Sequence, residues 1–130
     1  MYEIIVVSHG SFAKGLVESA ELIAGSNSEV ITFGLFEGAN IDDFKNSIKE
    51  AITAAKSRKD VIVLTDLMSG TPFNVVSMLM SEIDFHHITG INLPIYLELY
   101  TSRTSCEASE ICGNLKEFGL QSFIYVNDLI

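Results

Sequence analysis

Two side chains that could carry chemistry come directly after apolar stretches of the sequence. His9 follows the apolar run at residues 4–7, and Asp66 follows the run at residues 61–65. If both runs are neighbouring parallel strands, the imidazole and the carboxylate meet at the same edge of a sheet. A carboxylate that accepts a hydrogen bond from Nδ1–H fixes the tautomer and leaves Nε2 free as a nucleophile. The pair therefore indicates phosphoryl transfer through His9, with Asp66 orienting the ring.

Small residues next to this pair could bind a phosphate group, because backbone amides at the start of a helix attract anions. Simpler interpretations stay open at this point. His9 could merely end a strand, Asp66 could start an Asx turn, and the hydroxyl residues could be ordinary turn and cap residues. The candidate phosphate-binding residues are Gly10, Ser11, Ser69, Gly70 and Thr71.

The elements that would position these residues alternate between strand and helix. Continuous apolar stretches predict strands at residues 2–8, 30–34, 61–65, 85–89 and 122–126. Helical periodicity begins near Ser11, Asn40 and Thr71, and returns at residues 94–100 and 104–119. Thr71 is the expected N-cap of the third helix, with Pro72 at its first position.

This alternation predicts a single α/β domain over residues 1–130. We expect an open, doubly wound, mostly parallel sheet with strand order 2-1-3-4, built with right-handed crossovers. In such a sheet the ligand site lies at the switch point, here between the strands that precede His9 and Asp66. His86 and His87 are adjacent in the fourth strand and point to opposite faces, so we interpret both as structural.

Composition narrows the choice of partners and location. The chain has 8 basic and 17 acidic residues and a net charge of −9, which argues against nucleic acid and anionic membranes as partners but permits a basic protein. No apolar run approaches the ~20 residues of a membrane span, and no positive N-terminal region precedes the first strand. We expect a cytoplasmic protein with reduced Cys106 and Cys112, no direct membrane insertion, no cofactor and no metal site.

Three segments resemble signatures of a known family, the mannose-class enzyme IIA subunits of the bacterial phosphoenolpyruvate-dependent sugar phosphotransferase system. The sequence IIVVSHGSFA at residues 4–13 resembles the family's phosphorylation segment, which places the phosphohistidine at His9. The sequences LTDLMSGTPFN at residues 64–74 and TGINLP at residues 89–94 resemble two further signatures. Ser69 stands where the family often has Gly, and Thr71 where it often has Ser.

The resemblance implies a phosphotransferase of sugar uptake. The protein would accept a phosphoryl group from the phosphocarrier protein HPr on Nε2 of His9 and pass it to enzyme IIB. Enzyme IIB would then phosphorylate the sugar during its import. The resemblance also implies a homodimer, in which the strand at residues 122–126 is an antiparallel edge strand exchanged between the two copies.

Three other functions fit the sequence less well. A serine hydrolase lacks support, because no G-x-S-x-G turn occurs and Ser8 points away from His9. A receiver-like module phosphorylated on Asp66 would need acidic residues in place of Ser8 and His9 to hold Mg²⁺, and a Lys where Asn127 and Asp128 stand. A flavodoxin-like binding domain would carry a flavin, which a visible spectrum detects.

Overall fold

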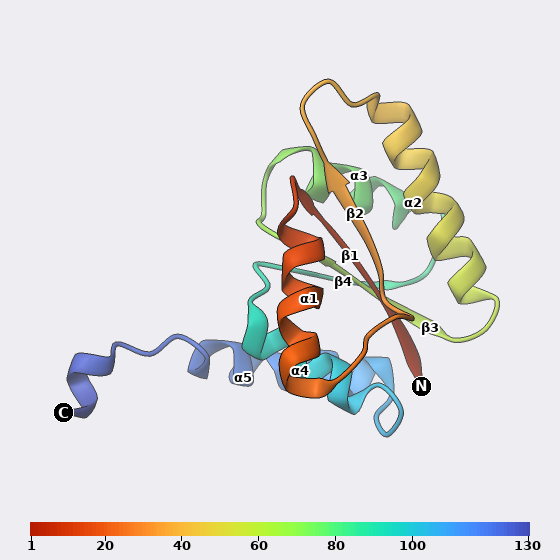
Figure 1. The fold of residues 1–130 in the computed structure, drawn as a ribbon. Helices are drawn as coiled ribbons and strands as arrows, with labels where there is room; N and C mark the ends of the chain where they lie inside the picture. The colour runs from red at the N-terminus through yellow and green to blue at the C-terminus, as the bar shows by residue number, and fades with distance from the viewer.

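The computed structural model describes all residues from Met1 to Ile130 (Figure 1). Strands and helices alternate along most of the chain, as expected for an α/β fold. No helix has both the length and the apolar character needed to cross a bilayer. The elements are β1 (Tyr2–His9), α1 (Phe12–Ala24), β2 (Ile31–Leu35), α2 (Ile41–Lys56), β3 (Asp60–Thr65), α3 (Gly70–Leu79), β4 (His86–Thr89), α4 (Leu93–Ser102), α5 (Ala108–Gln121) and a 3₁₀ helix, η1 (Val126–Leu129).

The four strands form one parallel sheet in the order β2-β1-β3-β4, which confirms the expected order. β1 pairs with β2 on one side, where His9 is opposite Leu35, and with β3 on the other, where Val7 is opposite Thr65. The carboxyl ends of β1 and β3 are therefore side by side in the middle of the sheet. The chain reverses its winding direction at this point.

The two central strands are buried on both faces, which explains why they are continuously apolar. In β1, Ile4 and Val6 pack into a core with α1, α4 and α5. Ile5 and Val7 point the other way and pack with α2 and α3. These two cores fix the sheet between its helical layers, so the loops at the ends of β1 and β3 start from rigid supports.

The start of α3 differs from the sequence prediction, which placed its N-cap at Thr71. The structure places the N-cap at Ser69 and begins the helix at Gly70. Gly70 has a positive φ of 84°, a conformation that glycine adopts without steric cost. The chain therefore turns into the helix at Gly70, and Thr71 lies inside the first turn.

The predicted strand at residues 122–126 is absent from the structure, and this part of the prediction is wrong for the chain by itself. Residues 122–125 have no regular secondary structure, and η1 follows them. The segment leads away from the body of the molecule after α5 (Figure 1). A strand needs the backbone of a neighbour to satisfy its hydrogen bonds, and none of the four strands pairs with this segment.

Candidate functional site

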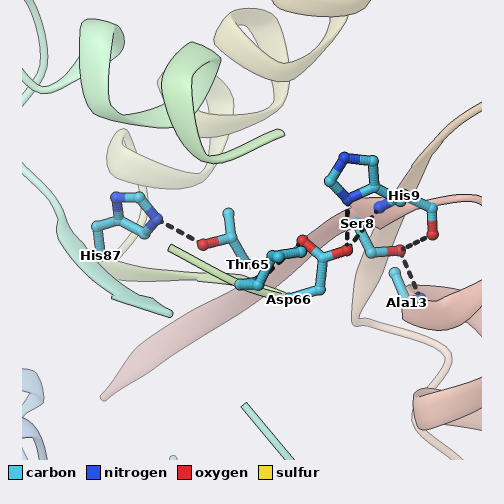
Figure 2. Close-up of polar contacts among 7 residues, drawn as sticks. Ser8, His9, Ala13, Thr65, Asp66 and His87 are labelled. Atoms are coloured by element: carbon cyan, nitrogen blue, oxygen red, sulfur yellow. Dashed lines mark hydrogen bonds and ion pairs between the residues drawn. The ribbon is translucent and has the colours of Figure 1, made fainter. Parts of the chain in front are cut away.

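His9 and Asp66 lie together at the centre of the carboxyl edge of the sheet (Figure 2). His9 is the last residue of β1, and Asp66 directly follows β3. Nδ1 of His9 lies 2.8 Å from Oδ2 of Asp66, and the backbone N–H of His9 donates to the same oxygen at 2.9 Å. The other oxygen, Oδ1, accepts from the backbone N–H of Leu67 at 3.0 Å. These three hydrogen bonds fix the carboxylate with respect to the ring.

The environment of Asp66 favours its ionised form. Burial acts to raise the pKa of this carboxyl group, but the hydrogen bonds and charge of His9 and the hydrogen bond from Leu67 outweigh burial and lower the pKa below its ordinary value. An ionised carboxylate only accepts hydrogen bonds, so Nδ1 of His9 carries the proton. The lone pair of the neutral ring is then on Nε2.

Nε2 of His9 faces the start of α3. A Cβ atom added to Gly70 would lie 2.9 Å from Nε2 and 3.0 Å from Cε1 of His9, so position 70 accepts no side chain without displacing the ring. The imidazole side chain is 47% exposed, so part of the ring is accessible to solvent. Nε2 thus lies against the first residue of α3, and the start of a helix is a favourable place for an anion.

The remaining candidate residues lie in the two segments that follow β1 and β3. Gly10 and Ser11 connect β1 to α1, while Ser69 and Thr71 flank Gly70 at the start of α3. Neither Ser11 nor Ser69 caps its helix with its side chain, so both hydroxyl groups stay available to a ligand. No three His, Cys, Asp or Glu side chains gather in a way that would hold a metal ion.

Ser8 has a structural role that the sequence analysis missed. Its side chain is fully buried, and its Oγ accepts a hydrogen bond from the N–H of Ala13 at 2.8 Å (Figure 2). The same hydroxyl donates to the carbonyl oxygen of His9 at 3.0 Å. Ser8 therefore fastens the first turn of α1 to the end of β1. Because this serine is buried and points away from the imidazole, it is not a nucleophile.

Gly34 allows β2 to pass close to the loop that follows His9. The backbone N–H of Gly10 donates to the carbonyl oxygen of Leu35 at 2.7 Å. A Cβ atom on Gly34 would lie 2.2 Å from the carbonyl oxygen of Gly10, far inside van der Waals contact. Only glycine fits at this position, and the sequence pattern of β2 gave no sign of the requirement.

Four exposed apolar side chains come shortly after β1, β2 and β3 in the chain. They therefore belong to the carboxyl edge of the sheet, the edge at which His9 lies. Large apolar groups at an accessible site are typical of a surface that contacts another protein. These side chains are Phe12, Phe36, Leu67 and Met68.

Comparison with known proteins identifies the family. The family model described as "PTS system fructose IIA component", EIIA-man, matches residues 3–116. The chain belongs to the mannose-class EIIA family of the sugar phosphotransferase system. EIIA components are phosphotransferase components of this system, so this EIIA chain takes part in sugar phosphotransfer.

Individual relatives agree with this assignment. The EIIA chain is 30% identical to the fructose-specific EIIA component of Bacillus subtilis, over 95% of this chain and 85% of the relative. It is 31% identical to the sorbose-specific EIIA component of Lacticaseibacillus casei, over 87% and 82% of the two chains. The crystal structure of an EIIA component from Streptococcus agalactiae superimposes with a TM-score of 0.86 at 30% identity, covering 98% of this chain and 99% of that chain.

Proposed function

We propose that this EIIA chain carries a phosphoryl group on Nε2 of His9. It receives the group from phosphorylated HPr and passes it to enzyme IIB, which phosphorylates the sugar during transport. The observation that supports this proposal is the division of roles between the two ring nitrogens. Nδ1 is 2.8 Å from Oδ2 of Asp66, whereas Nε2 faces the start of α3 and solvent.

The transfer step is a substitution at phosphorus. The lone pair on Nε2 of His9 forms the new N–P bond, while the N–P bond in HPr breaks and its electron pair returns to the imidazole of HPr. His9 keeps its proton on Nδ1 throughout, so positive charge develops on the ring. The carboxylate of Asp66 stabilises that charge, and the same arrangement serves the reverse role when enzyme IIB accepts the group.

Five residues in the segments that follow β1 and β3 would bind the phosphoryl oxygens. The backbone amides at the start of α1 and α3 point to the end of the sheet where the group would lie, and helix N-termini favour anions. The exposed hydroxyls at these helix starts add donors. The residues assigned to this role are Gly10, Ser11, Ser69, Gly70 and Thr71.

The surface of the molecule fits a protein donor. Exposed apolar side chains follow β1, β2 and β3 at the same edge of the sheet as His9, and the chain has a net charge of −9. A donor with an apolar centre and a positive rim would be attracted over a distance and then desolvate the site on contact.

A phosphorylation assay tests the assignment of His9. Incubation with phosphoenolpyruvate, enzyme I and HPr should add a phosphate that is labile in acid and stable in base, and mass spectrometry should locate it on His9. His9→Ala should remove the label, and a label retained in this variant would refute the proposal. With purified phospho-HPr the step should proceed in EDTA, whereas loss of transfer in EDTA would favour phosphorylation of Asp66 with Mg²⁺.

We also propose that the chain forms a homodimer in which residues 122–126 of each copy pair, antiparallel, with β4 of the other. β4 is an edge strand of the sheet, and an unpaired edge is a template for another strand. A groove of about 660 Å³ lies between β4 and α5. Ile88 and Leu115 line it, and so do Ser122 and Phe123 at the start of the chain's own C-terminal segment. The C-terminal segment exposes Phe123, Ile124 and Val126, and such side chains would fill an apolar groove of this kind.

A further inference from the structure

A second histidine lies beneath the site, on the inner side of α3. His87 is opposite Val63 in the pairing of β4 with β3, so its side chain is on the sheet face that α3 covers. Its Nε2 shares a hydrogen bond of 2.8 Å with Oγ1 of Thr65 (Figure 2). Its Nδ1 lies 3.5 Å from Oγ of Ser77, and its ring packs against that of Phe73 with the centroids 5.2 Å apart.

These contacts connect His87 to both elements that frame His9. Thr65 is the last residue of β3 and directly precedes Asp66. Phe73 and Ser77 belong to α3, the helix whose first residue lies against Nε2 of His9. A single imidazole thus contacts β3, which Asp66 directly follows, and α3, whose first residue lies against Nε2 of His9.

The chemistry of His87 suits a fixed hydrogen-bonding group rather than a second phosphate carrier. Burial lowers the pKa of His87 to about 4, so the ring is neutral at pH 7. A neutral imidazole has one donor and one acceptor, which matches the hydroxyl groups on either side of it. Its Nε2 is already occupied by the hydrogen bond with Thr65.

A neighbouring threonine on β4, Thr89, provides a comparison for Thr65, because its hydroxyl group has no hydrogen-bond partner. Thr89 is opposite Thr65 in the register of β3 and β4. Its Oγ1 is buried and has no hydrogen-bond partner in the chain, whereas Oγ1 of Thr65 has His87. The hydroxyl group of Thr65 therefore connects β3 to His87 on β4, whereas the hydroxyl group of Thr89 makes no such connection.

We propose that His87 is a positioning residue for phosphoryl transfer at His9, acting through Thr65 and α3. It holds the end of β3 at a set distance from the first turns of α3. This contact fixes two positions relative to His9: that of Asp66, which accepts its hydrogen bond, and that of the amides at the start of α3. This inference deepens the proposed function and rests on it.

The test compares two threonine variants of nearly the same shape. Thr65→Val removes the hydroxyl that His87 contacts, and Thr89→Val removes the unpartnered hydroxyl beside it. In single-turnover transfer from purified, saturating phospho-HPr, Thr65→Val and His87→Leu should slow the reaction by about tenfold, because small displacements of positioned groups have large effects on rate. Thr89→Val should react at the wild-type rate.

A measurement on the unphosphorylated protein separates positioning from simple loss of stability. The ¹⁵N chemical shifts of the His9 ring should report the Nδ1–H tautomer in the wild type and in Thr89→Val. In Thr65→Val and His87→Leu the shifts should move towards a mixture with the Nε2–H tautomer. Wild-type rates and wild-type ring shifts in folded Thr65→Val would overturn the role of His87. A wild-type protein that accepts no phosphate would instead refute the proposed function, while the ring shifts would still test the link between His87 and His9.

Discussion

At the scale of single residues, position 70 is restricted both by the ring of His9 and by its own backbone conformation. An alanine there would place Cβ 2.9 Å from Nε2 of His9 and would need a φ of 84°. We expect Gly70→Ala to slow transfer from phospho-HPr on the order of 10²-fold, because the ring or the start of α3 must move. The left-handed backbone should also lower the free energy of unfolding by about 1–2 kcal/mol, as measured by urea denaturation.

The matched control is Gly113→Ala in α5. Gly113 is an exposed helical residue, and a Cβ atom added to it would meet no atom within 4 Å. Alanine favours helix over glycine by about 1 kcal/mol, so this variant should be slightly more stable and transfer at the wild-type rate. Equal rates in Gly70→Ala and Gly113→Ala would contradict the placement of the phosphoryl group beside Gly70.

The charge of Asp66 is tested by Asp66→Asn, which keeps the size of the side chain. An amide can turn its NH₂ group towards Nδ1 and so favour the wrong tautomer. By analogy with other His–Asp pairs, we expect transfer to slow on the order of 10²-fold or more, with the phosphate still on His9. If Asp66 were itself the acceptor, the variant would lose all label while His9→Ala kept it. An unchanged transfer rate would show that Asp66 only stabilises the turn after β3 and does not orient His9.

Protonation of His87 should make the fold less stable in mild acid. Burial lowers its pKa from the ordinary value of 6.5 to about 4, so between these values the unfolded chain binds more protons than the folded one. The free energy of unfolding therefore falls as the pH is lowered from about 6.5 to about 4. His87→Leu should remove this part of the slope in urea titrations at several pH values. A variant with the full wild-type slope would show that another group causes it.

At the scale of elements, the first and third strands carry most of what the sequence could predict. Their continuous apolar runs are typical of strands buried on both faces, and parallel pairing then brings His9 and Asp66 together. The order 2-1-3-4 followed from the handedness of crossovers and the alternation of elements. Local sequence pattern was sufficient here because both residues directly follow their strands.

Other features depend on contacts that no local pattern encodes. The hydrogen bond between Thr65 and His87 requires the register of β3 and β4, and the need for glycine at position 34 comes from a loop 24 positions earlier, at Gly10. The strand expected at residues 122–126 has no partner in its own chain. The segment is apolar, as a strand would be, but a strand forms only where a neighbouring backbone satisfies its hydrogen bonds.

The hydroxyl of Ser8 offers a test of how α1 is attached to β1. Ser8→Ala leaves the N–H of Ala13, now bonded to Ser8 Oγ at 2.8 Å, without a partner in a buried position. We expect the free energy of unfolding to fall by about 1–2 kcal/mol and the amide of Ala13 to lose protection from hydrogen exchange. Exchange at Ile52, in the core of α2, serves as the reference for global unfolding. Unchanged protection at Ala13 would rule out a stabilising role for the hydrogen bond between Ser8 and Ala13.

At the scale of the whole molecule, the C-terminal segment exposes apolar side chains that the rest of the chain does not cover. The side chain of Phe123 is 86% exposed and that of Ile130 fully exposed. The C-terminal segment extends away from the body of the molecule (Figure 1), whose sheet ends in the edge strand β4. Pairing of two copies would cover the segment and the edge together, because each copy supplies what the other lacks.

Light scattering provides the test of this dimer. The full chain should have about twice the mass of one 14.3 kDa chain, and Phe123→Ser with Ile124→Ser should shift the protein towards the monomer, since both side chains would leave the apolar groove. Leu22→Ser is the control, because Leu22 is 92% exposed on α1 and lies outside the segment. It should leave the mass unchanged. A full chain that stays at 14.3 kDa over a wide concentration range would refute the exchange of residues 122–126, whereas the site at His9, built from β1, β3 and α3 of one chain, would stand.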